Sequence, residues 1–73
     1  MIRFRLKELI ADKEFREGRR ITYEEIASAT GIHRTTLSKI ANQKGYNTTT
    51  DALDLLCKYF KVNVCDLAEF VDE

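Results

Sequence analysis

The chain has 73 residues, of which 44% are hydrophobic and 33% are charged, and its formal net charge is zero. This length leaves room for one domain. So small a domain has few residues with which to enclose a catalytic pocket. The composition is that of an ordinary globular protein, and no apolar run approaches the roughly 20 residues that span a bilayer. We therefore expect a single cytoplasmic domain over residues 1–73 that is neither an enzyme nor a membrane protein.

Charged side chains are divided unevenly along the chain. Residues 1–47 carry ten basic and six acidic side chains, a net charge of +4, whereas residues 48–73 carry two basic and six acidic ones, a net charge of −4. A total charge of zero counts against nucleic acid, but only the basic part of a protein needs to face a duplex. We interpret the acidic part as a surface kept away from DNA. A solvated face explains four of the basic side chains as well as a DNA-facing surface does: Lys13, Arg16, Arg19 and Arg20.

The first residues alternate between apolar and basic side chains, in the order Ile2, Arg3, Phe4, Arg5 and Leu6. A period of two is typical of an extended strand, so the pattern predicts a short N-terminal arm, which could pair with another chain. From Leu6 onward the apolar residues follow helical spacing and predict a first helix that ends at about Phe15.

The second and third helices of the chain are predicted next, with a short turn between them. Thr22 and Glu25 form the capping-box pattern that begins a helix, and Gly31 can adopt the left-handed conformation that ends one after Thr30. A third helix follows at once. Its apolar positions are Ile32, Leu37 and Ile40, and its other side carries Arg34, Thr35, Ser38, Lys39 and Asn42.

The second half of the chain predicts two more helices. Thr48 and Asp51 form another capping box, ahead of apolar residues at helical spacing that end at Phe60. Asn63 and Asp66 then cap a short final helix. Its apolar positions are Val64, Leu67, Phe70 and Val71. The predicted fold class is all-α, with five helices and no sheet apart from the extended arm.

Cysteine and histidine give no sign of a chemical site. Cys57 and Cys65 are the only cysteines, and nothing in the sequence indicates an oxidising compartment that would bridge them. Together with His33 they match no zinc spacing and offer no pairing of a base with a nucleophile. We expect no metal, no cofactor and no catalytic residue.

Three segments together resemble the Cro/repressor, or xenobiotic-response-element, type of helix-turn-helix family. They are residues 21–27 (ITYEEIA), 30–40 (TGIHRTTLSKI) and 60–67 (FKVNVCDL), and the likeness covers nearly the whole chain. It implies a five-helix, lambda-repressor-like DNA-binding domain with its helix-turn-helix core at residues 22–44. It also implies that the third helix enters the major groove of double-stranded DNA, and that the protein binds as a homodimer.

The resemblance implies two groups of DNA contacts. The predicted base-contacting residues are Arg34, Thr35, Ser38 and Lys39. The predicted backbone-contacting residues are Thr22, Tyr23, His33, Asn42, Gln43 and Lys44. Tyr23 stands where many relatives have Gln, and His33 replaces the usual small capping residue. As alternatives, Thr35 and Thr36 could cap the third helix, His33 could be a solvated surface residue, and Tyr46 could cover the edge of the core.

The function that follows is that of a small transcriptional regulator, most simply a repressor. The alternative is an antitoxin-like or phage-encoded protein-interaction module of the same fold, in which the acidic second part of the chain docks a protein partner. For the surface between two copies, the candidates are the arm with Ile2 and Phe4 and the exposed side of Phe70 and Val71.

Overall fold

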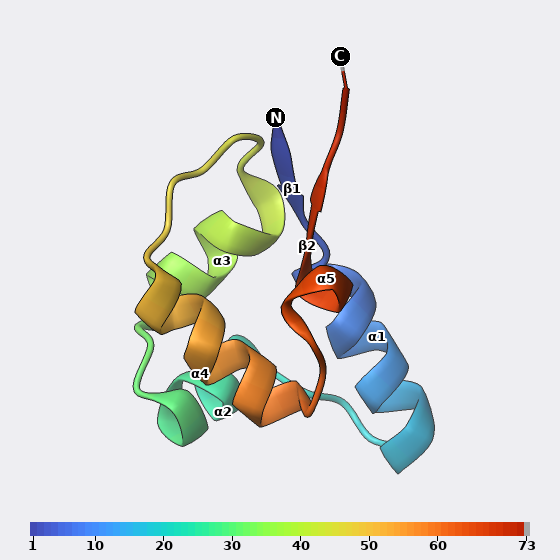
Figure 1. Ribbon diagram of the computed structural model, residues 1–73. Helices are drawn as coiled ribbons and strands as arrows, with labels where there is room; N and C mark the ends of the chain where they lie inside the picture. The colour runs from blue at the N-terminus through green and yellow to red at the C-terminus, as the bar shows by residue number, and fades with distance from the viewer. Residues whose placement is uncertain (73) are drawn as a thin grey trace.

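Five helices pack around one apolar core in the computed structural model, which describes residues 1–72 (Figure 1). In chain order the helices are α1 (Leu6–Glu17), α2 (Tyr23–Thr30), α3 (Arg34–Asn42), α4 (Thr50–Phe60) and α5 (Val64–Leu67). Two short strands, β1 (Ile2–Phe4) and β2 (Ala68–Phe70), bring the beginning and the end of the chain together. The helical fold predicted from the sequence is confirmed, and the sheet is an addition to it.

Each helix contributes one fully buried aliphatic side chain to the core. These side chains are Leu6, Ile26, Leu37, Leu56 and Leu67. Burying such a side chain stabilises the fold by roughly 1.5–3 kcal/mol relative to leaving it in water. Every helix supplies one of the five, so the helices share a single apolar core.

Local capping signals explain where α2 begins and where α1 and α2 end. The hydroxyl of Thr22 accepts a hydrogen bond from the amide of Glu25 at 3.1 Å, as predicted for the start of α2. Gly31 has φ 81° and donates its amide to the carbonyl of Ala27 at 2.8 Å, which ends α2 in the left-handed conformation. Gly18, with φ 65°, ends α1 two residues later than the sequence predicts.

The predicted start of α4 is wrong by one residue. Thr49, not Thr48, is the cap, and its hydroxyl accepts a hydrogen bond from the amide of Ala52 at 3.1 Å. The backbone of Thr49 is extended, with φ −92° and ψ 157°, and the helical residues begin at Thr50, as is typical of a cap. Three consecutive threonines, Thr48 to Thr50, stand here, and the capping-box pattern favours Thr48 only because Asp51 lies three residues later.

The final helix is much shorter than predicted, and this is the main correction to the sequence-based fold. After Leu67 the backbone becomes extended, and β2 pairs antiparallel with β1 in the register Ile2 with Phe70, Arg3 with Glu69 and Phe4 with Ala68. The amide of Arg5 also donates to the carbonyl of Leu67 at 2.6 Å. A helix continuing through Phe70 could not make these hydrogen bonds with the arm. The arm therefore pairs with its own chain.

Candidate nucleic-acid interface

The turn between α2 and α3 is held by side-chain hydrogen bonds as well as by Gly31. The hydroxyl of Thr30 donates to the carbonyl of Ile26 at 2.7 Å and accepts from the amide of Ile32 at 3.2 Å. Ile32 is buried just beyond this turn, so the beginning of α3 is anchored to the core. Thr30 thus links the end of α2 to the start of α3, a role that the sequence pattern does not reveal.

His33 caps α3, and neither Thr35 nor Thr36 does. The Nδ1 atom of His33 accepts a hydrogen bond from the amide of Thr35 at 3.1 Å. A neutral imidazole whose Nδ1 accepts carries its proton on Nε2, which is then a free donor. His33 is exposed, so the predicted contact with a DNA phosphate, which stays a prediction, would be made through Nε2.

A shallow surface groove separates the beginning of α2 from the outer side of α3, and we call it the α2/α3 groove. Positions 34, 35, 38 and 39 share one face of α3 because residues one helical turn apart are neighbours. That face lines the groove together with the first turn of α2. The lining residues are Thr22, Tyr23, Glu24, Arg34, Thr35, Ser38 and Lys39. The fold thus brings together all four predicted base-contacting residues and two of the predicted backbone-contacting residues.

The other predicted backbone-contacting residues lie outside this groove. His33 precedes α3, whereas Asn42, Gln43 and Lys44 lie at its far end. Asn42 donates its side-chain amide to the carbonyl of Ser38 at 2.9 Å. A contact from this amide to a DNA phosphate would have to replace that bond, whereas Lys44 makes no ion pair within residues 1–72.

Two of the base-contacting candidates have neighbours that the sequence does not indicate. Arg34 lies 3.5 Å from the carboxylate of Glu24, and both side chains are largely exposed, at 65% and 76%. The Lys39 ammonium lies 6.0 Å from the centre of the Tyr46 ring, which is half-buried against the core. The prediction that Tyr46 covers the core edge is confirmed. The sequence did not predict that Glu24 lies beside Arg34, because an acidic side chain ten residues earlier does not by itself indicate an ion pair.

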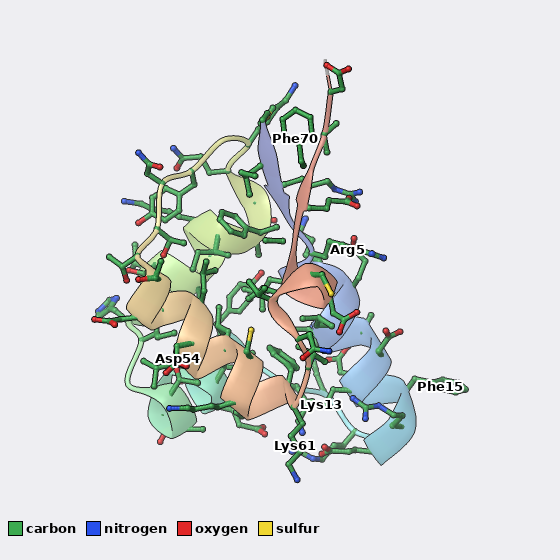
Figure 2. All side chains as sticks on the ribbon, in the orientation of Figure 1. Arg5, Lys13, Phe15, Asp54, Lys61 and Phe70 are labelled. Atoms are coloured by element: carbon green, nitrogen blue, oxygen red, sulfur yellow. The ribbon has the colours of Figure 1, made fainter. Side chains whose placement is uncertain are left out.

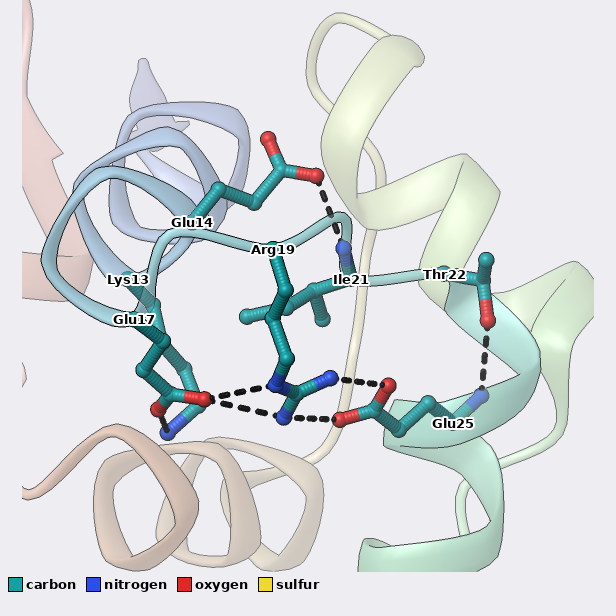
Figure 3. Close-up of polar contacts among 7 residues, drawn as sticks. All are labelled: Lys13, Glu14, Glu17, Arg19, Ile21, Thr22 and Glu25. Carbon is teal, nitrogen blue, oxygen red and sulfur yellow. Dashed lines mark hydrogen bonds and ion pairs between the residues drawn. The ribbon is translucent and has the colours of Figure 1, made fainter.

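The connection from α1 to α2 is fixed by a network of charged side chains (Figure 3). Arg19 donates two hydrogen bonds to the carboxylate of Glu25, at 2.8 and 2.7 Å, and one to Glu17 at 2.9 Å. The amide of Ile21 donates to the carboxylate of Glu14 at 2.8 Å, just before α2 begins. Glu25 therefore bonds Arg19, whereas the predicted capping box would have it bond the amide of Thr22.

These contacts change the acidity of the two glutamates. The hydrogen bond from Lys13 is the main reason that the pKa of Glu17 lies below its usual value. The hydrogen bonds from Arg19 lower the pKa of Glu25 in the same way. Lys13 and Arg19 are thus engaged in ion pairs at the entry to α2.

The described part of the chain contains no other grouping that indicates chemistry. Within residues 1–72 no three His, Cys, Asp or Glu side chains gather as metal ligands would. Cys57 and Cys65 are free thiols, and burial is the main cause that raises the pKa of Cys57. Among the described residues, no helix has both the length and the apolar character to cross a membrane.

Comparison with known families agrees with this geometry. A family model described as the Cro/C1-type HTH DNA-binding domain matches residues 5–73. A comparison with curated protein sequences found no significant match. The matched range contains α1 to α5 and β2, and it begins just after β1.

Proposed function

Because the chain belongs to the Cro/C1-type helix-turn-helix DNA-binding family, we propose that it is a sequence-specific transcriptional repressor whose α3 lies in the major groove. The observation that carries the proposal is the α2/α3 groove, in which the exposed face of α3 lies beside the first turn of α2. The major groove of B-DNA is about 12 Å wide and admits an α-helix. Leu37 and Ile40 anchor the opposite side of α3 in the core and Ile32 anchors the turn before it, so the helix is presented as a rigid ridge.

Within this arrangement the α3 side chains read bases. Arg34 and Lys39 donate to the acceptor edge of guanine, the commonest specific contact, and each good pair contributes about 1–3 kcal/mol of discrimination. Thr35 and Ser38 carry hydroxyls that can donate to or accept from either kind of base edge. Four side chains on one face cover only a few consecutive base pairs, so one copy reads a short half-site.

Other residues hold the DNA backbone and set the position of α3. Thr22 and Tyr23 open α2, where the positive end of the helix favours a phosphate. His33 donates through Nε2 at the start of α3, and Asn42, Gln43 and Lys44 reach the backbone at its other end. Such contacts fix the orientation of the protein but do not read sequence.

Repression requires only that the protein occupies its site and excludes polymerase. We propose that two copies bind as a two-fold homodimer, because one α3 reads too short a sequence to be specific. Two half-sites on one face of the duplex would then lie about 34–36 Å apart. The operator is expected to be a palindrome for the same reason.

The experiment that tests the function is selection from a randomised pool of double-stranded DNA at two salt concentrations. The chain is compared with Arg34→Ala and with the matched control Arg16→Ala, which removes an exposed arginine of α1. We expect the original chain and the control to enrich one palindrome, and Arg34→Ala to lose its preference at one base pair of each half-site. Absence of enrichment at low salt would contradict the proposal and favour a protein partner.

A further inference from the structure

One residue of α1, Glu14, holds most of the connection that leads into α2. Its carboxylate accepts a hydrogen bond from the amide of Ile21 at 2.8 Å (Figure 3). Its backbone carbonyl accepts from the amide of Gly18 at 2.8 Å and from that of Arg19 at 3.3 Å. Three of the four backbone amides of residues 18–21 therefore donate to this one residue. Because a buried amide without a partner is costly, these bonds fix the path of the connection.

The side chain of Glu14 is used for this contact alone. It makes no ion pair within residues 1–72, whereas the nearby Glu17 pairs with both Lys13 and Arg19. The next residue, Phe15, projects from α1 into solvent and is 89% exposed (Figure 2), whereas Glu14 is half-buried beside the connection. In the described part of the chain, the bond to the connection is the one hydrogen bond that the Glu14 side chain makes.

The bond lies directly before the first turn of α2. Ile21 is buried in the core, and the next residue, Thr22, caps α2 by accepting from the amide of Glu25 at 3.1 Å. Thr22 and Tyr23 line the α2/α3 groove and are the residues proposed to hold a DNA phosphate. A change in the path of residues 18–21 would therefore displace these two residues first.

The position of α3 is held by other contacts. Thr30 bonds the end of α2 to the turn before α3, and Leu37 and Ile40 bury the inner side of α3 in the core. Neither the turn nor the inner side of α3 has a hydrogen bond to Glu14. The first turn of α2 and the base-contacting face of α3 are thus fixed separately, the former from α1 and the latter from the core.

We infer that Glu14 is a positioning residue for the DNA-phosphate contacts of Thr22 and Tyr23, and that it acts through the amide of Ile21. The inference rests on the proposed function and adds to it a residue of α1, outside the helix-turn-helix motif. Backbone contacts orient the protein on the duplex but do not read sequence. Loss of the Glu14 bond should therefore weaken binding to all duplexes by a similar factor and leave the base preference unchanged.

Two substitutions separate the reach of this side chain from its charge. Glu14→Gln removes the charge but keeps an oxygen acceptor at the same distance from the helix, whereas Glu14→Asp keeps the charge but withdraws the acceptor by one methylene. We expect Glu14→Gln to bind selected and unselected duplexes at least as tightly as the original chain. We expect Glu14→Asp to bind both at least about fivefold more weakly, because hydrogen bonds to a charged phosphate are misaligned. Fluorescence anisotropy below the melting temperatures of the variants measures both affinities.

Asp12→Asn is the control for the lost charge, because Asp12 is an exposed carboxylate of α1 that makes no ion pair within residues 1–72. Any gain in affinity from the charge alone should appear in this control as well as in Glu14→Gln. A Glu14→Asp variant that binds as tightly as the original chain, or that prefers different bases, would overturn the inference. So would a Glu14→Gln variant that binds as weakly as Glu14→Asp.

Amide hydrogen exchange tests the contact without DNA. The Ile21 amide should exchange faster in Glu14→Asp and as slowly as in the original chain in Glu14→Gln, whereas a general loss of stability would speed exchange throughout the core. If Glu14→Asp does not fold, loss of Ile21 protection or of DNA affinity in Glu14→Gln still contradicts the inference. A chain that selects no DNA would refute the proposed function and this inference together. Selection by the original chain with equal binding by Glu14→Asp would refute the inference alone.

Discussion

Glu24 lines the α2/α3 groove beside the predicted base-contacting side chains, and its carboxylate lies 3.5 Å from Arg34. An exposed ion pair of this kind contributes no more than about 1 kcal/mol. It can therefore hold the guanidinium over the groove in the free protein and release it when guanine or a phosphate competes. Because the negative charge would oppose phosphates that approach the groove in the wrong position, we expect Glu24 to affect the discrimination between DNA sequences.

Replacing Glu24 with Gln tests this role. We expect affinity for unselected DNA to rise about two- to fivefold, because a repulsion of about 0.5–1 kcal/mol is removed, while the melting temperature stays unchanged. Fluorescence anisotropy with selected and unselected duplexes measures the effect. Asp54→Asn is the control, because Asp54 is an exposed, ion-paired carboxylate on α4, outside the groove. Equal or weaker binding by Glu24→Gln would contradict the assignment.

At the scale of the elements, the orientation of α3 depends on how α2 ends. Gly31 has φ 81°, and a Cβ atom added there would meet nothing within 4 Å. A side chain at this position therefore causes backbone strain but no collision. The left-handed conformation costs roughly 1–2 kcal/mol for an ordinary residue and less for asparagine, whose side chain bonds locally.

We expect Gly31→Ala to reduce the free energy of unfolding by roughly 1–2 kcal/mol, and Gly31→Asn to reduce it by less. Urea denaturation of the two variants measures the difference. Equal losses would show that the cost comes from filling space near the turn and not from the backbone conformation.

The connection from α1 to α2 makes stability depend on pH. Glu17 and Glu25 have a pKa lowered from 4.5 in the folded chain, so they are harder to protonate folded than unfolded. Their contribution to stability is present above about pH 4.5 and is lost as the pH falls through the lowered folded values. Arg19 is the partner common to both carboxylates.

Replacing Arg19 with Gln should lower the melting temperature at neutral pH, and the difference from the original chain should shrink below about pH 4 as both glutamates become protonated. Arg20→Gln is the control, because Arg20 is exposed and makes no ion pair within residues 1–72. Thermal melts over a pH series measure both variants. A difference that stays constant with pH would show that Arg19 acts through packing alone.

For the whole molecule, the uneven division of charge limits which face can approach DNA. The basic first part of the chain contains the helix-turn-helix motif and Lys44, whereas α4, α5 and β2 belong to the acidic part. A cation that neutralises a phosphate releases counterions from the DNA. Each neutralised phosphate therefore makes the slope of log affinity against log salt concentration more negative by about 0.9. The salt dependence therefore reports how many cations face the duplex.

We expect Lys44→Ala to weaken binding uniformly across DNA sequences and to reduce the salt slope by about one unit. Lys58→Ala removes a lysine of α4 that pairs with Asp54, and it should leave the slope unchanged. Titrations at several salt concentrations with the selected duplex give both slopes. An unchanged slope for Lys44→Ala would remove Lys44 from the predicted backbone contacts.

Local sequence patterns are sufficient to predict the five helices, most of the core and the face of α3 that carries the predicted base-contacting residues. A cap, a left-handed glycine and apolar residues one turn apart lie within a few residues of each other, so each signal can be read without knowing the fold. The two-stranded sheet follows only from the folded chain, because Arg3 and Glu69 lie 66 residues apart and a short extended segment does not encode its partner. The position of Glu24 beside Arg34 also emerges only on folding, since it depends on the angle at which α2 and α3 meet. The whole chain must bury its apolar side chains and pair its backbone polar groups, and this requirement determines which distant segments come into contact. No local pattern contains that information.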